Sequence, residues 1–188
     1  MIKIDNISFS YGENKIFGNF SLDIENGGRV CLFGPSGVGK TTLLRVIMGL
    51  EKVLSGSVDT ENAVISAVFQ EDRLLPYKTV MENLTLFTNE ARASECLSAL
   101  GLSGAASLYP AELSGGMARR VAIARALSVE ADVYIFDEAF SGLDSENIER
   151  AAAFINEKTA GKILIAVSHS ALDAKRLNAR IVDIHSSL

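Results

Sequence analysis

Residues 30–41 read VCLFGPSGVGKT, and the expected fold is organised around this stretch. Four apolar residues, typical of a buried strand, lead into the pattern G-x-x-x-x-G-K-T at residues 34–41. Glycines let the backbone curve so that successive N–H groups point inward, and the helix that follows adds its free N–H groups. The stretch therefore predicts a loop between a strand and a helix that binds the phosphates of a nucleotide.

The side chains at the end of this loop suit phosphate and metal. The Lys40 ammonium can reach the β- and γ-phosphates, and the Thr41 hydroxyl can bind Mg²⁺. The residues that we expect to bind the nucleotide here are Gly34, Pro35, Ser36, Gly37, Val38, Gly39, Lys40, Thr41 and Thr42.

Strands and helices are predicted on both sides of the loop. Alternating patterns predict half-exposed strands at 2–9 and 16–24, and short apolar runs predict buried strands at 64–69, 132–136 and 162–167. Helices are predicted at 40–50, 80–101 (one or two), after Ser114, at 145–158 and at 171–177, with a last strand at 180–184. This alternation predicts an α/β fold with a mainly parallel sheet covered on both faces.

Polar residues follow three of the buried strands, and ligands of open parallel sheets bind beyond the carboxyl ends of the strands. Asp137 can bind magnesium, and Glu138 can orient or deprotonate an attacking water. Gln70 can contact the metal or the water, and His169 can donate a hydrogen bond to the γ-phosphate. An isolated Asp-Glu pair would be read as a solvated strand end, but the convergence of these residues favours one shared site.

Composition limits the remaining possibilities. A chain of 188 residues fits one domain, residues 1–188, and the net charge of −5 predicts no nucleic-acid partner. Cys31 and Cys96 are isolated, so we expect neither a disulfide framework nor a zinc site, and a reducing, cytoplasmic setting fits best. We also expect no secretory signal and no membrane helix, because no apolar run reaches about 18 residues.

A second glycine-rich helix start occurs at LSGGMARR, residues 113–120. Ser114 is placed to cap a helix, and Gly115 and Gly116 leave the N–H groups accessible, so the segment is an anion site in principle. A simple helix cap with a flexible lead-in is the commoner use of these residues. The helix has one apolar face, formed by Met117, Val121, Ala124 and Leu127.

Taken in order, these motifs resemble those of the ATP-binding cassette (ABC) ATPases. LSGGMARR resembles the signature sequence of that family, Gln70 its Q-loop glutamine, residues 141–144 (SGLD) its D-loop, and His169 its switch histidine. The resemblance implies ATP and Mg²⁺ as cofactors, and a P-loop NTPase core with N-terminal antiparallel strands. It also implies a small helical subdomain at about 71–128.

The resemblance also implies how the second motif is used. Two cassettes of this family pack head to tail, and each signature helix contacts the γ-phosphate held by the other copy. Ser114, Gly115 and Gly116 would then bind the neighbour's ATP, Asp144 would lie at the interface, and Tyr11 would stack on adenine. ATP would close the dimer and hydrolysis would release it, which can drive a partner.

The implied function is that of an ATP-hydrolysing subunit of a transporter. The expected partners are transmembrane permease subunits, a second copy of the chain and, through the transporter, a solute-binding protein. Such a subunit is peripheral at the cytoplasmic face of the membrane. Residues 70–84, QEDRLLPYKTVMENL, look most like cassettes of importers for nitrate, sulfonate or taurine-type solutes, and residues 71–95 would contact the permease.

Other classes of P-loop protein are the alternatives to a transporter subunit. A non-transport cassette acting in DNA repair, cell division or another mechanical role is the main alternative, and a P-loop kinase or GTPase would leave LSGG unexplained.

Three residues differ from the family pattern. Met117 stands where the family usually has glutamine, Ala139 where it has proline, and Ser170 where it has aspartate. None of these removes a predicted phosphate, metal or water contact, so we expect hydrolysis.

Overall fold

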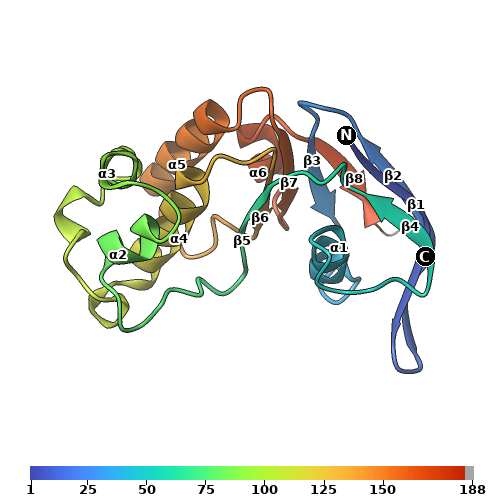
Figure 1. Ribbon diagram of the computed structural model, residues 1–188. Coiled ribbons are helices and arrows are strands. Elements are labelled where there is room, and N and C mark those ends of the chain that lie inside the picture. Colours follow the sequence, from blue (N-terminus) through green and yellow to red (C-terminus); the bar gives the residue numbers. More distant parts are fainter. Residues whose placement is uncertain (185–188) are drawn as a thin grey trace.

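The computed structural model describes residues 1–184, and its centre is a five-stranded parallel sheet (Figure 1). The strand order is β5-β6-β7-β3-β8, and every neighbouring pair is parallel. The bounds are β3 (Arg29–Phe33), β5 (Ile65–Val68), β6 (Val133–Asp137), β7 (Ile163–Val167) and β8 (Arg180–Asp183). The predicted α/β fold with a mainly parallel sheet is confirmed.

A second, antiparallel sheet has the order β2-β1-β4. Its strands are β1 (Ile2–Tyr11), β2 (Asn14–Ile24) and β4 (Ser55–Asp59). The sequence prediction missed β4, because its residues SGSVD are mostly exposed and have no apolar alternation. Gly56 in β4 has φ +80°, and a Cβ there would lie 2.4 Å from the carbonyl oxygens of Asp5 and Asn6. Close backbone approach, rather than side-chain packing, thus explains this strand.

Six α-helices occur among the described residues, close to the predicted positions: α1 (Lys40–Ile47), α2 (Val80–Thr85), α3 (Glu90–Ala99), α4 (Gly115–Ser128), α5 (Ser145–Lys158) and α6 (Ala171–Arg176). Side chains cap most of them. Thr79 and Glu82 form a reciprocal capping box at α2, and Ser114 and Asp144 accept hydrogen bonds from the first turns of α4 and α5. Two short 3₁₀ turns, Ser103–Ala105 and Pro110–Glu112, precede α4.

The parallel sheet is buried on both faces, which explains its continuous apolar strands. In β6, Val133 and Ile135 pack with α1 and the antiparallel sheet, whereas Tyr134 and Phe136 pack with α4 and α5. Figure 1 shows these two layers on opposite sides of the central strands. The buried Tyr134 hydroxyl is satisfied, because it donates to the Val129 carbonyl at 2.8 Å.

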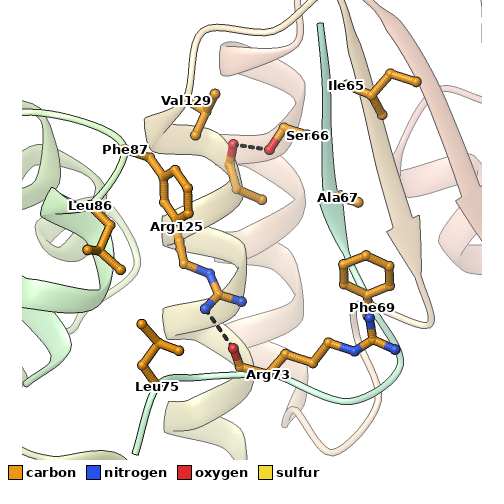
Figure 2. A pocket seen from close by; sticks show the side chains of 11 residues that line it. Ile65, Ser66, Ala67, Phe69, Arg73, Leu75, Leu86, Phe87, Arg125 and Val129 are labelled. Carbon is orange, nitrogen blue, oxygen red and sulfur yellow. Dashed lines mark hydrogen bonds between the residues drawn. The ribbon is translucent and has the colours of Figure 1, made fainter. Parts of the chain in front are cut away.

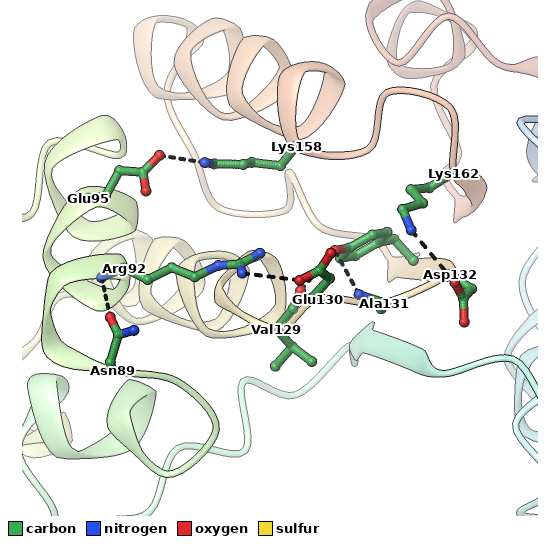
Figure 3. Close-up of polar contacts among 10 residues, drawn as sticks. Asn89, Arg92, Glu95, Val129, Glu130, Ala131, Asp132, Lys158 and Lys162 are labelled. Atoms are coloured by element: carbon green, nitrogen blue, oxygen red, sulfur yellow. Dashed lines mark hydrogen bonds and ion pairs between the residues drawn. The ribbon is translucent and has the colours of Figure 1, made fainter.

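Helices α2, α3 and α4 form a lobe beside the sheet (Figure 1), which ion pairs connect to the core (Figure 3). Lys158 of α5 pairs with Glu95 of α3, and Arg92 lies 3.8 Å from Glu130. Each exposed pair contributes about 0–1 kcal/mol, so apolar packing supplies most of the attachment. No helix within residues 1–184 combines the length and the apolar character needed to cross a bilayer.

Asn83 holds the loop before α2 in place. The side chain is fully buried, and its Oδ1 accepts from the Leu75 N–H at 2.8 Å. Its Nδ2 donates to the carbonyls of Lys78 and Thr79 at 3.0 and 2.9 Å. One side chain therefore satisfies backbone groups at both ends of residues 75–79.

We expect Asn83→Ala to lower the free energy of unfolding by about 2 kcal/mol, because it leaves several partly buried backbone groups without partners. Urea unfolding followed by circular dichroism measures the change. Asn89→Ala is the matched control, since it removes a single exposed capping bond at α3 and should cost about 1 kcal/mol or less. Equal losses in the two variants would contradict the role of Asn83.

Candidate active site

The loop between β3 and α1 is held in its curve by glycine. Gly34, Gly37 and Gly39 have φ values of +149°, +82° and +102°, a region that other residues rarely adopt. A Cβ on Gly39 would lie 2.5 Å from Ile16 Cγ2 and 2.8 Å from the Phe17 ring. The second antiparallel strand therefore presses against the loop, and glycine is required there for space as well as for conformation.

Lys40 lies inside this curve. Its Nζ donates to the carbonyls of Gly34 at 2.6 Å and Pro35 at 2.8 Å, and the residue is buried. Burial lowers the pKa of the ammonium, while the nearby Glu138 and Asp137 carboxylates oppose that shift. The loop thus surrounds a buried cation, which is the arrangement that an anionic ligand requires.

Asp137, the last residue of β6, faces the first turn of α1. The Thr41 hydroxyl donates to Asp137 Oδ2 at 2.9 Å, and the aspartate is 3% exposed. Burial raises the pKa of the Asp137 carboxyl, and the hydrogen bond from Thr41 opposes this rise. A hydroxyl and a desolvated carboxylate in contact are two hard oxygen donors of the kind that Mg²⁺ prefers.

Glu138 points away from its neighbour because its backbone is left-handed, with φ +53°. Its N–H donates to the Val167 carbonyl at 3.0 Å, which anchors this turn on β7. Its Oε1 lies 2.8 Å from His169 Nε2, and the two side chains are 24% and 48% exposed. The structure therefore brings the predicted base and the predicted γ-phosphate donor into direct contact beside solvent.

A cavity of about 220 Å³ joins most of the predicted residues. It is lined by Ile16, Ser36, Gly37, Gly39, Lys40, Thr41, Thr42, Gln70, Glu138, Val167 and His169. Two of these, Ile16 and Val167, were not predicted. The only sequence signal for Ile16 was its place in the strand after the first hairpin, and Val167 was hidden within a buried strand.

Gln70 and Tyr11 occupy different positions relative to this cavity. Gln70 lines it and also lines an adjoining cavity of about 150 Å³ that contains Thr41 and Asp137. Tyr11 is not among the lining residues. It lies half exposed at the end of β1, with its hydroxyl 3.4 Å from Glu51 Oε1. Gln70 thus adjoins the metal-type donors, whereas the role of Tyr11 in adenine stacking stays a prediction.

The second glycine motif lies outside the cavity. Ser114 caps α4, and its Oγ accepts from the Met117 N–H at 3.2 Å. A Cβ on Gly116 would lie 3.3 Å from the Gly142 carbonyl, so this helix start adjoins residues 141–144. Asp144 caps α5, and hydrogen bonds from the backbone and side chain of Asn147 lower the pKa of its carboxyl.

The structure shows where the three residues that differ from the family pattern lie. Ala139 is buried, and the Ser170 hydroxyl caps α6 by accepting from the Leu172 N–H at 3.2 Å. Met117 is partly buried and packs against the core. Ser170 therefore has a structural role of its own, and none of the three residues lines the cavity around Lys40.

Comparison with known sequences agrees with this geometry. The ABC transporter family model matches residues 17–141, more than half of the chain. The aliphatic sulfonates import ATP-binding protein SsuB 1 of Rhodococcus jostii (strain RHA1) is 38% identical over an alignment covering 94% of this chain and 76% of that protein. The arginine transport ATP-binding protein ArtM of Bacillus subtilis (strain 168) is 35% identical, with 97% and 86% covered.

Solved structures lead to the same family. The dimeric structure of MJ0796, a bacterial ABC transporter cassette, has a TM-score of 0.84 and 29% identity, covering 98% of this chain and 95% of that chain. A dimeric post-hydrolysis state of the same cassette bound to ADP and Pi has a TM-score of 0.85 and 30% identity, with 97% and 94% covered.

These findings confirm the predicted ATP-binding and ATP-hydrolysing cassette, and they favour a transport role over the non-transport alternative. The sulfonate-import relative also agrees with the resemblance seen in residues 70–84. A kinase or GTPase is excluded, because the match is to the ABC transporter family model and its range includes LSGG, residues 113–116. The chain belongs to the ABC transporter family, as an ATP-binding cassette.

Proposed function

We propose that the cavity around Lys40 binds the triphosphate of ATP, with the loop 34–39 and the N-terminus of α1 as its anion site. The buried ammonium and the inward-curving backbone carry this proposal. Lys40 leaves its carbonyl partners to contact the β- and γ-phosphates, and Thr42 adds a hydroxyl at the cavity wall. Tyr11 supplies an aromatic face for adenine.

Mg²⁺ fits the oxygen donors beside the phosphates. We propose Thr41 and Asp137 as its protein-side partners, with the Gln70 amide oxygen approaching from the adjoining cavity. Residues 1–184 contain no cluster of three or more His, Cys, Asp and Glu side chains suited to a metal. A magnesium ion held mainly by phosphate oxygens does not need one, because Mg²⁺ in such sites takes only one or two carboxylates.

Glu138 is the proposed general base, and His169 contacts the γ-phosphate. The 2.8 Å contact between them supports this pairing, because the imidazole can hold the carboxylate in place while remaining open to solvent and ligand. Val167 also lines this cavity, and its carbonyl accepts from the Glu138 N–H. Proton transfer by a positioned carboxylate contributes about 10²–10⁴-fold to such reactions.

A second copy of the chain completes each site in this proposal. Ser114, Gly115 and Gly116 present a helix start outside the cavity of their own copy, so their phosphate would be the one held by the neighbour. Asp144 would lie at that contact, since Gly116 adjoins residues 141–144. The relatedness to dimeric cassettes supports this head-to-tail arrangement.

The permease is proposed to contact the groove shown in Figure 2. This groove of about 400 Å³ lies between β5 and the helical lobe, and its lining is mostly apolar: Ile65, Ser66, Ala67, Phe69, Arg73, Leu75, Leu86, Phe87, Arg125, Ala126 and Val129. Phe87 is 63% exposed, and Leu75 and Leu86, which also line the groove, are 43% and 47% exposed. Large exposed apolar side chains around a groove are typical of a protein interface.

The cassette would therefore act at the cytoplasmic face of a membrane, attached through its permease, with residues 71–128 as the helical subdomain that contacts it. A solute-binding protein would join only through the permease. The relatives are named for solutes as different as sulfonates and arginine, so the choice of solute belongs to the partner proteins.

Glu138→Gln should lower the rate of MgATP hydrolysis at least about 10²-fold, because an amide cannot accept the proton of the attacking water. ATP binding should persist, and an ATP-stabilised dimer should accumulate in size-exclusion chromatography. Glu130→Gln makes the same change at an exposed position and should hydrolyse ATP normally. Undiminished hydrolysis by the Glu138 variant would remove this residue from its role.

Mixed dimers test the arrangement of the two copies. When Lys40→Ala and Ser114→Arg are on separate chains, both lesions fall in one pocket and the other pocket stays intact. When both lesions are on one chain, each pocket carries one lesion. We expect phosphate release to be clearly higher in the first dimer. Equal rates in the two dimers would exclude the trans contact.

Phe87→Ser should weaken attachment to membrane vesicles that contain the native permease, since it removes a large apolar contact from the groove. Sedimentation of the labelled cassette with the vesicles measures this. We expect about a tenfold or greater loss of affinity, as is usual for a central aromatic contact. Leu54→Ser is the matched control, because Leu54 is also highly exposed but does not line the groove. Similar losses in both variants would argue against this surface.

A further inference from the structure

Arg119 is a buried cation in the second turn of α4, near the end of the LSGGMARR segment. Its Nη1 donates to the Phe69 carbonyl at 2.7 Å, and its Nη2 donates to the Gln70 carbonyl through a short hydrogen bond. Its Nη1 also lies 3.2 Å from Asp72 Oδ1. One guanidinium therefore makes two hydrogen bonds and one ion pair with the segment that follows β5.

This segment begins where β5 stops pairing with β6, so its backbone has no hydrogen bonds from a neighbouring strand in that register. The register between β5 and β6 ends with Val68 opposite Phe136, so Phe69 and Gln70 lie just beyond the paired strands. Arg119 supplies donors to their carbonyls from α4. The position of Gln70 thus depends on a side chain from a helix about 50 residues away in sequence.

A second arginine of α4 continues the same pattern. Arg125 donates to the carbonyls of Asp72 and Arg73 at 2.9 and 2.8 Å, and Figure 2 shows its contact with the Arg73 carbonyl. Together the two guanidiniums bind four carbonyls between residues 69 and 73. Arg125 faces the groove, whereas Arg119 holds the residue that faces the nucleotide cavity.

The guanidinium is well suited to this task. It is planar and carries several donors in a fixed arrangement, so two bonds to adjacent carbonyls define both the position and the orientation of the peptide. The Asp72 carboxylate balances its charge in a buried setting. A shift of α4 along its axis would therefore move the Gln70 backbone with it.

We propose that Arg119 is a positioning residue for ATP hydrolysis, which holds Gln70 at the metal end of the cavity by binding the carbonyls of Phe69 and Gln70. This inference rests on the proposed function of Gln70 at the metal and the attacking water. Because Ser114 caps α4, the same helix also links the neighbour's nucleotide to the Gln70 of its own copy.

A double-mutant cycle with Gln70 tests the proposal. ATP turnover is measured for the unaltered chain, Arg119→Met, Gln70→Ala and the double variant, each over a range of Mg²⁺ concentrations. Arg119→Met keeps the apolar stem and removes the donors. We expect it to lower kcat about tenfold, to change KM for ATP by less than about threefold and to raise the Mg²⁺ concentration for half-maximal rate.

Non-additivity is the decisive result. In the Gln70→Ala background, Arg119→Met should lower kcat by less than about twofold, because the side chain that it positions is already gone. An equal loss in both backgrounds would overturn the proposal, and so would an unchanged kcat and Mg²⁺ dependence in the single variant. Arg92→Gln removes an arginine from the same lobe without touching residues 69–73, and should leave kcat and Mg²⁺ dependence unchanged.

Thermal unfolding of each variant separates positioning from loss of fold. If Arg119→Met does not fold, Arg119→Lys provides the test, since lysine keeps the charge but lacks the planar fork. It should fold and still show a lower kcat and a higher Mg²⁺ concentration for half-maximal rate, and unaltered values would overturn the proposal. Failure of the proposed role of Gln70 looks different, because Gln70→Ala alone would then retain full kcat and an unchanged Mg²⁺ dependence. Failure of the proposed active site as a whole would leave Glu138→Gln and Lys40→Ala with full turnover.

Discussion

The parallel pairing of β3, β7 and β6 is the constraint on which the candidate site depends. Val167, at the end of β7, pairs with Leu32 of β3 on one side and with Asp137 of β6 on the other. Because the three strands end at the same level, the residues that follow them emerge at one edge of the sheet. The contact between Glu138 and His169 follows from this alignment, although the two residues are 31 positions apart in sequence.

The adjacent carboxylates of Asp137 and Glu138 have different surroundings because of the backbone conformation at Glu138. The left-handed conformation at Glu138 turns its side chain to His169 and the solvent, while Asp137 stays buried against Thr41. A non-glycine residue in this region carries backbone strain, and such strain persists where the surrounding structure imposes it. Here the hydrogen bond to the Val167 carbonyl helps to impose it. The result is one carboxylate suited to a metal and one suited to a water.

Helix α4 contacts three regions that lie outside the parallel sheet. Its capped start adjoins residues 141–144, its middle holds the backbone at Gln70, and its last turns line the apolar groove. In the proposed dimer, these three regions face the neighbour's nucleotide, the copy's own nucleotide and the permease. A single rigid helix thus offers a physical route by which events at the three sites can influence one another.

The sequence by itself determined what is local: the phosphate loop needs glycines and a lysine at set spacing, and the helix caps and the apolar strands depend on short-range patterns. It therefore predicted the parallel sheet, all five of its strands and most residues that line the cavity. Only the tertiary structure decided what depends on distant segments coming together. Three features are of this kind: the pairing of exposed β4, the contact of Ile16 with the loop, and the hydrogen bond from Arg119 to the Gln70 carbonyl. No periodic pattern in the sequence indicates them, because each arises from packing between separate elements.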